Sequence, residues 1–79
     1  MEFKHIISNP TILGGKPVLR GSRISVEIIL EWMASGATIP DILTKYPHLM
    51  LEGVQEALLY ASRSIAHETI IEVQTSEAI

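Results

Sequence analysis

Residues 14–26 (GGKPVLRGSRISV) gather three glycines, a proline and three cations, a composition that could hold a phosphate group. The P-loop of nucleotide-binding proteins needs a glycine five positions before its Gly-Lys pair and a hydroxyl residue after the lysine. This sequence has Pro10 and Pro17 at those positions. The glycines also lack the G-x-G-x-x-G spacing of dinucleotide-binding folds. We therefore expect no nucleotide cofactor, and the segment is better explained as a turn that carries charge.

Histidines could otherwise support catalysis or bind a metal, but they lie far apart in the sequence, at His5, His48 and His67. His67-Glu68 begins like a zinc-protease motif, yet Ile71 stands where a second histidine is required one helical turn later. The chain has no cysteine, which excludes disulfides and thiolate zinc sites. No nucleophile has an evident base beside it. We expect a protein that is not an enzyme and that uses no cofactor or metal.

Charge is distributed unevenly along the chain, whose net charge is −3. Residues 1–25 hold four cations and one acid, a net charge of +3, whereas residues 26–79 hold two cations and eight acids, a net charge of −6. A polyanion such as DNA would therefore approach the N-terminal segment. The alternative is a small dimer that places opposite charges on opposite faces.

Lys16, Arg20 and Arg23 are the cations of the glycine-rich segment, and we predict that they contact DNA. The alternative is that either arginine pairs with Glu27 or Glu31 and ties the segment to the helix that follows. The sequence leaves both possibilities open.

The first 24 residues predict an N-terminal β arm. A short strand at 3–7 runs into a turn at Asn9-Pro10. Ile12-Leu13 and Val18-Leu19 then flank a glycine pair that tolerates the positive φ angles of a hairpin turn. The residues of the turn and its structural motif are Gly14, Gly15, Pro17, Gly21 and Ser22.

The strand at 3–7 has no second full-length strand in its own chain, and an isolated hairpin is marginally stable in water. We therefore expect a homodimer in which the arm of a second subunit covers Phe3, Ile6 and Ile7.

Helical spacing of apolar residues predicts three helices after the arm, at about residues 26–35, 39–46 and 51–65. Ser25 is a good N-cap for the first helix, and Gly36 stands where a left-handed residue should end it. Thr38 and Asp41 resemble a capping box at the start of the second helix. The apolar stripe of the third helix is Leu51, Val54, Ala57, Leu58, Ala61 and Ile65.

Three short helices after a β arm predict a mainly α fold, a three-helix helix-turn-helix bundle of the winged-helix or homeodomain type. The third helix would then be the recognition helix, and its outer face would carry Glu52, Gln55, Glu56, Leu59 and Arg63. Gln55 and Arg63 could read bases, whereas the acids would meet phosphates unfavourably. Protein binding is the competing use of this face.

A single domain at residues 1–67 leaves a C-terminal tail at 68–79. The tail interleaves glutamates with Ile70, Ile71 and Val73, and we predict that these aliphatic side chains bind a partner protein. The alternative is that they pack back on the protein's own dimer as an extension of the third helix.

The run from Gly14 to Val18, followed by the run from Arg20 to Ile24, resembles the signature of a small prokaryotic family, domain of unknown function 433. The likeness continues through Tyr46-Pro47-His48-Leu49 and covers roughly residues 5–67. It implies a winged-helix or homeodomain-like fold with an N-terminal β element. It also implies a role as the antitoxin of a toxin–antitoxin pair, often beside a PIN-like nuclease toxin.

Three positions depart from the family pattern. Ser22 stands where threonine is usual, Ser25 where proline is usual, and Leu51 where the third helix often begins with a hydroxyl residue. Both serines can still hydrogen-bond or cap. Leu51 cannot, and it weakens the end of the helix that would have to lie against DNA.

The sequence thus predicts an antitoxin-like, DNA-binding regulator of a toxin–antitoxin pair, with a protein-only interaction module as the alternative. The regulator would bind promoter DNA, a PIN-like toxin or both, whereas the alternative module would bind a toxin without binding DNA. In either case we expect a homodimer. No apolar run approaches the roughly 18 residues that cross a membrane, and the N-terminus lacks the features of a signal peptide. We therefore expect a cytoplasmic protein with no membrane partner.

Overall fold

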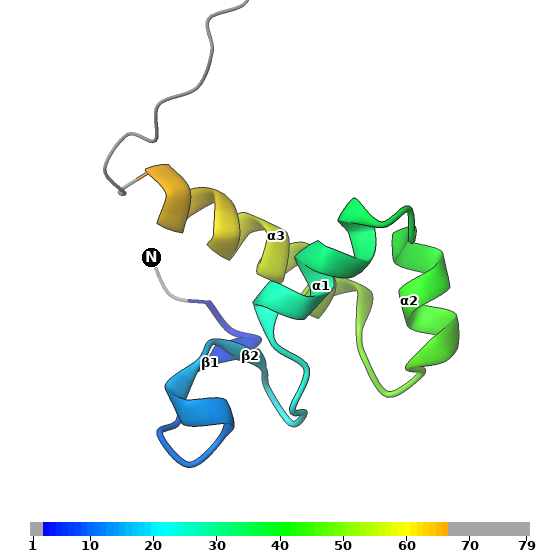
Figure 1. The fold of residues 1–79 in the computed structure, drawn as a ribbon. Coiled ribbons are helices and arrows are strands. Elements are labelled where there is room, and N and C mark those ends of the chain that lie inside the picture. The colour runs from blue at the N-terminus through cyan, green and yellow to red at the C-terminus, as the bar shows by residue number, and fades with distance from the viewer. Residues whose placement is uncertain (1–2, 67–79) are drawn as a thin grey trace, which may run out of the picture.

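The computed structural model describes residues 3–66, which form a two-stranded sheet, a 3-10 turn and three α-helices (Figure 1). In chain order the elements are β1 (Ile6–Ile7), η1 (Leu13–Gly15), β2 (Val18–Leu19), α1 (Val26–Ala34), α2 (Ile39–Lys45) and α3 (Leu51–Ala66). The predicted class, mainly α with an N-terminal hairpin, is confirmed, and the predicted helix bounds differ from these by one residue at most. The hairpin and α2 lie at opposite ends of the molecule, with α1 and α3 between them (Figure 1).

The hairpin is built differently from the sequence prediction. β1 and β2 are antiparallel, with Ile6 opposite Leu19 and Ile7 opposite Val18. The expected two-residue turn between strands at 12–13 and 18–19 is wrong. Two successive tight turns occupy that place, since Ile12 N donates to Asn9 O and Gly15 N donates to Ile12 O. Ile12 is extended, but Leu13 has a φ of +50°, so residues 12–13 do not form a continuous strand.

β1 finds its partner in its own chain, so the premise from which we expected an arm-exchanged dimer is wrong. Ile6 is buried in the core, and Ile7 is half-buried. The ring of Phe3 packs edge-on against Tyr60 of α3, with ring centroids 5.2 Å apart. The homodimer itself stays a prediction, and it now needs a different surface.

The helix ends follow local capping signals. Ser25 Oγ accepts a hydrogen bond of 3.0 Å from Ile28 N at the start of α1. At the start of α2, Thr38 Oγ1 accepts from Asp41 N while Asp41 Oδ2 accepts from Thr38 N, at 3.2 and 2.9 Å. Gly36 adopts a φ of +108° just beyond α1, a conformation that costs glycine little. These three predictions are confirmed.

α3 organises the core, since it packs against both strands and both other helices. The buried cluster consists of Ile6, Leu19, Val26, Ile29, Ile42, Leu49, Val54, Ala57 and Ala61. Of the predicted stripe on α3, Val54, Ala57 and Ala61 are buried, but Leu51 and Ile65 are exposed because they stand at the two ends of the helix. No helix within residues 3–66 is long and apolar enough to cross a membrane.

Candidate nucleic-acid interface and aromatic pocket

Lys16 ties the arm (residues 3–24) to α1. Its Nζ lies 2.8 Å from Glu27 Oε1, and both side chains are exposed. This hydrogen bond raises the pKa of Lys16 above its ordinary value, and the charge of Glu27 adds to the effect. The alternative considered from the sequence was an ion pair between Arg20 or Arg23 and an acid of this helix. In the structure, Lys16 makes the ion pair with Glu27. An exposed pair of this kind contributes little stability, yet it diverts Lys16 from other anions.

Arg20 lies against the first residues of the chain. Its Nε donates to Lys4 O at 2.9 Å, and its backbone N donates to His5 O at 2.7 Å. Lys4 and Arg20 are both exposed, and with Phe3 and His5 they line an open hollow. Two cations that are 16 residues apart in sequence therefore share one surface. No local signal in the sequence indicates that Lys4 lies beside Arg20, since only the fold brings the two together.

The turn after β2 presents the second arginine. Ser22 Oγ donates to Leu19 O at 2.8 Å and accepts from Ile24 N at 3.0 Å. Gly21, with a φ of +80°, allows the chain to reverse there. Arg20 and Arg23 are both exposed on this turn. The Gly-Ser step thus directs the chain into α1 while the two arginines remain at the surface.

Glu56 clamps the arm onto α3. Its Oε1 accepts from His5 N at 2.6 Å, and its Oε2 lies 3.0 Å from His5 Nδ1. An ionised carboxylate only accepts hydrogen bonds, so Nδ1 must be the donor. These hydrogen bonds hold the pKa of the Glu56 carboxyl below its ordinary value. We predicted Glu56 on the outer face of the third helix; that is wrong, because the arm covers this part of α3.

The remaining outer face of α3 is mixed in character. Gln55 and Arg63, the predicted base-reading residues, are exposed. Eight helical residues separate them by about 12 Å along the axis and by about 80° around it, so they do not form one compact contact. Leu51 and Leu59 are also exposed, at 44% and 39%. Arg20 shares a hollow with Gly53 in the first turn of α3, whereas Arg63 stands near the opposite end of the helix.

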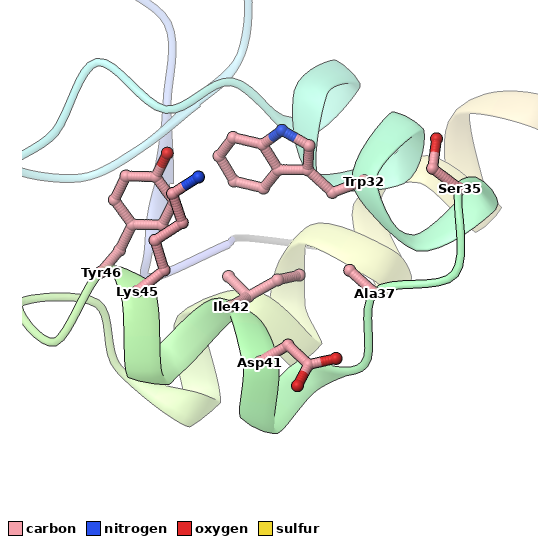
Figure 2. Close-up of a pocket in the computed structure, with 7 residues that line it drawn as sticks. All are labelled: Trp32, Ser35, Ala37, Asp41, Ile42, Lys45 and Tyr46. Atoms are coloured by element: carbon pink, nitrogen blue, oxygen red, sulfur yellow. The ribbon is translucent and has the colours of Figure 1, made fainter.

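A second surface lies between α1 and α2, where an aromatic pocket of about 240 Å³ opens (Figure 2). The rings of Trp32 and Tyr46 are stacked nearly parallel, with centroids 5.0 Å apart and planes 9° from each other. Both side chains are half-buried. The pocket is lined by Trp32, Ser35, Ala37, Asp41, Ile42, Lys45 and Tyr46.

Polar groups stand at the rim of this pocket. Lys45 Nζ lies 5.8 Å from the centroid of the Tyr46 ring. The Asp41 carboxylate is engaged in the capping box, and its hydrogen bonds with Thr38 hold the pKa of Asp41 below its ordinary value. No local signal in the sequence indicates that the rings of Trp32 and Tyr46, 14 positions apart, will stack.

Within residues 3–66, no group of three histidine or acidic side chains is placed to hold a metal ion. The predicted partner-binding residues Ile70, Ile71 and Val73 lie outside the described residues, as does His67.

Comparisons with known proteins identify relatives without an assigned activity. Residues 6–61 match the family "Protein of unknown function (DUF433)". The chain is 38% identical over 56 residues to the uncharacterized protein y4eO of Sinorhizobium fredii; the match covers 71% of this chain and only 25% of that protein. A crystal structure of a DUF433 member from Anabaena variabilis superposes with a TM-score of 0.75 at 27% identity, covering 78% of this chain and 61% of that one. The chain thus spans about a quarter of the first relative and less than two thirds of the second.

Proposed function

The chain belongs to the DUF433 family, whose function is unknown, and we propose that it is an antitoxin-like, DNA-binding regulator of a toxin–antitoxin pair. One observation carries the DNA-binding part of this proposal. The arm brings Arg20 beside Lys4 and against the first turn of α3, the helix that the helix-turn-helix arrangement would present to DNA.

Electrostatics supports this placement. The chain as a whole is acidic, with a net charge of −3, so a polyanion can approach only where cations gather. Lys4, Arg20 and Arg23 are exposed at the arm. Of the two acids expected to repel phosphates on α3, Glu56 is held by His5, whereas Glu52 is exposed. Phosphate contacts fix the position of a protein on DNA, and Gln55 on the neighbouring helix face is available for base contacts.

The test is the salt dependence of binding to the promoter of the protein's own operon. We expect a steep dependence, because each neutralised phosphate contributes a slope of about −0.9 in a plot of log K against log salt. Changing Lys16, Arg20 and Arg23 together to glutamine should weaken binding and reduce the slope by about 2, since Lys16 is diverted to Glu27. Binding that ignores both salt and the triple change contradicts the proposal.

The regulatory partner would be a PIN-like nuclease toxin encoded beside this protein, and the site of action would be the cytoplasm, where promoter DNA is found. This part rests on the family resemblance of the glycine-rich signature. Co-purification with the neighbouring gene product, together with relief of its nuclease toxicity, tests it directly.

A second candidate function is a protein-only interaction module. It is favoured by the half-buried Trp32–Tyr46 stack, since aromatic side chains in partly exposed pockets are the residues that dominate binding energy at protein interfaces. This candidate predicts partner capture without any promoter shift. A partner complex that is insensitive to Arg20 and Arg23 but lost on changing Trp32 selects it.

We also propose that the protein is a homodimer. With the arm folded onto its own chain, the surface that we assign is a groove of about 240 Å³ between α1 and α3. Leu30 and Ile65 are exposed there at 37% and 66%, beside Pro17 and Tyr60. A two-fold contact between α1–α3 faces would cover both side chains. Changing Leu30 and Ile65 together to glutamate should yield a folded monomer in sedimentation; an unchanged dimer excludes this groove.

A further inference from the structure

A small hollow lies where the arm meets the beginning of α3, apart from the aromatic pocket. Its volume is about 70 Å³, and it is lined by His5, Leu19, Arg20, Gly21, His48, Leu49, Met50 and Gly53. Three of these side chains carry nitrogen donors, and each comes from a different segment: the start of the arm, the turn after β2, and the connection between α2 and α3. The fold therefore gathers two imidazoles and a guanidinium around one concave site.

Arg20 is the principal donor at this hollow. Its Nε is fixed by Lys4 O, which orients the planar group, while within residues 3–66 its two terminal nitrogens make no hydrogen bond. A guanidinium fork of this kind matches the geometry of a phosphate oxygen pair. His48 is exposed at the other side of the hollow, and its ring meets Tyr46 only edge-on, at 6.3 Å between centroids. Its nitrogens are therefore available to a ligand.

The backbone at the start of α3 also offers hydrogen-bond donors to this hollow. Gly53 lies in the first turn of α3, where N–H groups have no intrahelical acceptor, and the helical hydrogen bonds begin with Val54 N donating to Met50 O. No acid lines the hollow. Both oxygens of nearby Glu56 accept from His5, and Glu52 in the same helical turn is exposed to water. The one charged side chain among the residues that line the hollow is therefore a cation, Arg20.

We propose that this hollow binds one phosphodiester group of the DNA backbone, and so sets the register of α3 on the duplex. The inference rests on the proposed DNA-binding function and names the site where contact is made. A volume of about 70 Å³ accepts a few water molecules or one compact anion and is too small for a base, so the contact is independent of sequence. Arg20 and His48 hold the phosphate oxygens, and the first N–H groups of α3 face it.

The test compares two ligands, a short duplex carrying the promoter sequence and inorganic phosphate, against single variants. Arg20→Gln and His48→Gln remove one donor each; the second variant leaves the Arg20–Lys4 hydrogen bond intact, so it reports binding even if the first perturbs the arm. Lys45→Gln is the charge-matched control, because Lys45 lies on α2 and does not line the hollow. Binding is followed by the salt dependence of affinity and by the amide resonances of Gly21 and Gly53.

We expect the duplex to shift both glycine amides in the unchanged protein. Each of the two variants should weaken duplex binding about three- to tenfold and abolish those shifts; Arg20→Gln, which removes a charge, should also lower the log–log salt slope by about 1. Lys45→Gln should change affinity less than about twofold. Inorganic phosphate should shift the same two amides weakly.

Three results overturn the inference, and they distinguish its failure from the failure of the proposed function. If the duplex binds with a steep salt dependence while both variants keep the affinity of the unchanged protein and the glycine amides stay unshifted, the DNA contact lies elsewhere and the proposed function stands. If the duplex does not bind and phosphate shifts neither amide, the proposed function fails together with its phosphate site. Phosphate shifts at Gly21 and Gly53 without duplex binding would show an anion site that is unrelated to DNA.

Discussion

The two ends of the molecule present different kinds of surface. At the arm–α3 contact, formed by His5, Leu19, Gly53 and Glu56, hydrogen bonds and a buried leucine fasten the arm to the central helix. At the aromatic pocket, two stacked rings remain half-buried between α1 and α2. At the arm end, side chains are held by specific contacts, and the cations Lys4, Arg20 and Arg23 are exposed beside them. At the pocket end, the two aromatic rings remain partly exposed to solvent.

This difference separates the two candidate functions. Long-range electrostatic attraction by Lys4, Arg20 and Arg23 suits a polyanion, whose binding depends on charge and salt. A concave aromatic site suits a protein side chain, whose binding depends on buried area and weakly on salt. Under our two proposals, DNA would bind at one end of the domain and a protein at the other. Changes at each end should therefore affect different properties.

The largest effect is expected from Leu19→Ala at the arm–α3 contact. Leu19 is 3% exposed, and truncation of such a side chain costs about 2–5 kcal/mol of unfolding free energy. That is a large fraction of the stability of a small domain. Urea denaturation measures the loss, with Leu59→Ala as the control, because Leu59 is 39% exposed and should cost about 1 kcal/mol or less. Equal losses would show that the arm is not part of the core.

Trp32→Ala should have the next largest effect, at the other end. The stack with Tyr46 contributes about 0.5–1.5 kcal/mol beyond its buried area, and Trp32→Phe should retain most of it. If the pocket binds a partner, Trp32→Ala should also abolish capture of that partner while promoter binding persists. Thermal melts and pull-downs on the same preparations measure both. Loss of promoter binding with retained partner capture would reverse our assignment of the two ends.

The two helix caps allow a smaller, matched comparison. Ser25 caps α1 beside the arm and is 6% exposed, whereas Thr38 caps α2 near the pocket and is exposed. Each cap typically contributes about 1 kcal/mol. We expect Ser25→Ala to cost more than Thr38→Ala, because a buried donor left without its acceptor is not rescued by water. Denaturation midpoints of the two variants decide this, and the opposite order would contradict the tighter packing that we assign to the arm side.

The smallest effect concerns pH. The pKa of Glu56 is held below its ordinary value of 4.5 in the folded protein, chiefly by its hydrogen bonds with His5. Its contribution to stability is therefore fully present above about pH 4.5 and is lost as the pH falls through the lowered pKa. Glu56→Gln should flatten the acid side of the stability profile. Asp41→Asn, whose carboxyl also has a lowered pKa, is the comparison at the other end. Identical acid profiles for the unchanged protein and Glu56→Gln would show that the clamp does not form in solution.

Much of the secondary structure of this protein is determined by short stretches of its sequence. Ser25 bonds to a residue three positions on, Thr38 and Asp41 bond to each other, and Gly36 ends a helix by its own backbone preference. Such signals act within one helical turn, so they need no knowledge of the fold. The helix bounds and the mainly α class followed from these signals together with the spacing of the apolar residues.

Contacts between distant residues were decided only by the tertiary structure. His5 and Glu56 are 51 positions apart, and nothing near either residue indicates the pairing. The pairing of β1 with β2, the approach of Lys4 to Arg20, and the Trp32–Tyr46 stack are of the same kind. In each case the free energy comes from surfaces that meet only after the chain has collapsed around α3. Residue types alone indicated that cations gather in the arm; the fold decided that Lys16 is paired, that Glu56 is covered, and that Arg20 faces the start of α3.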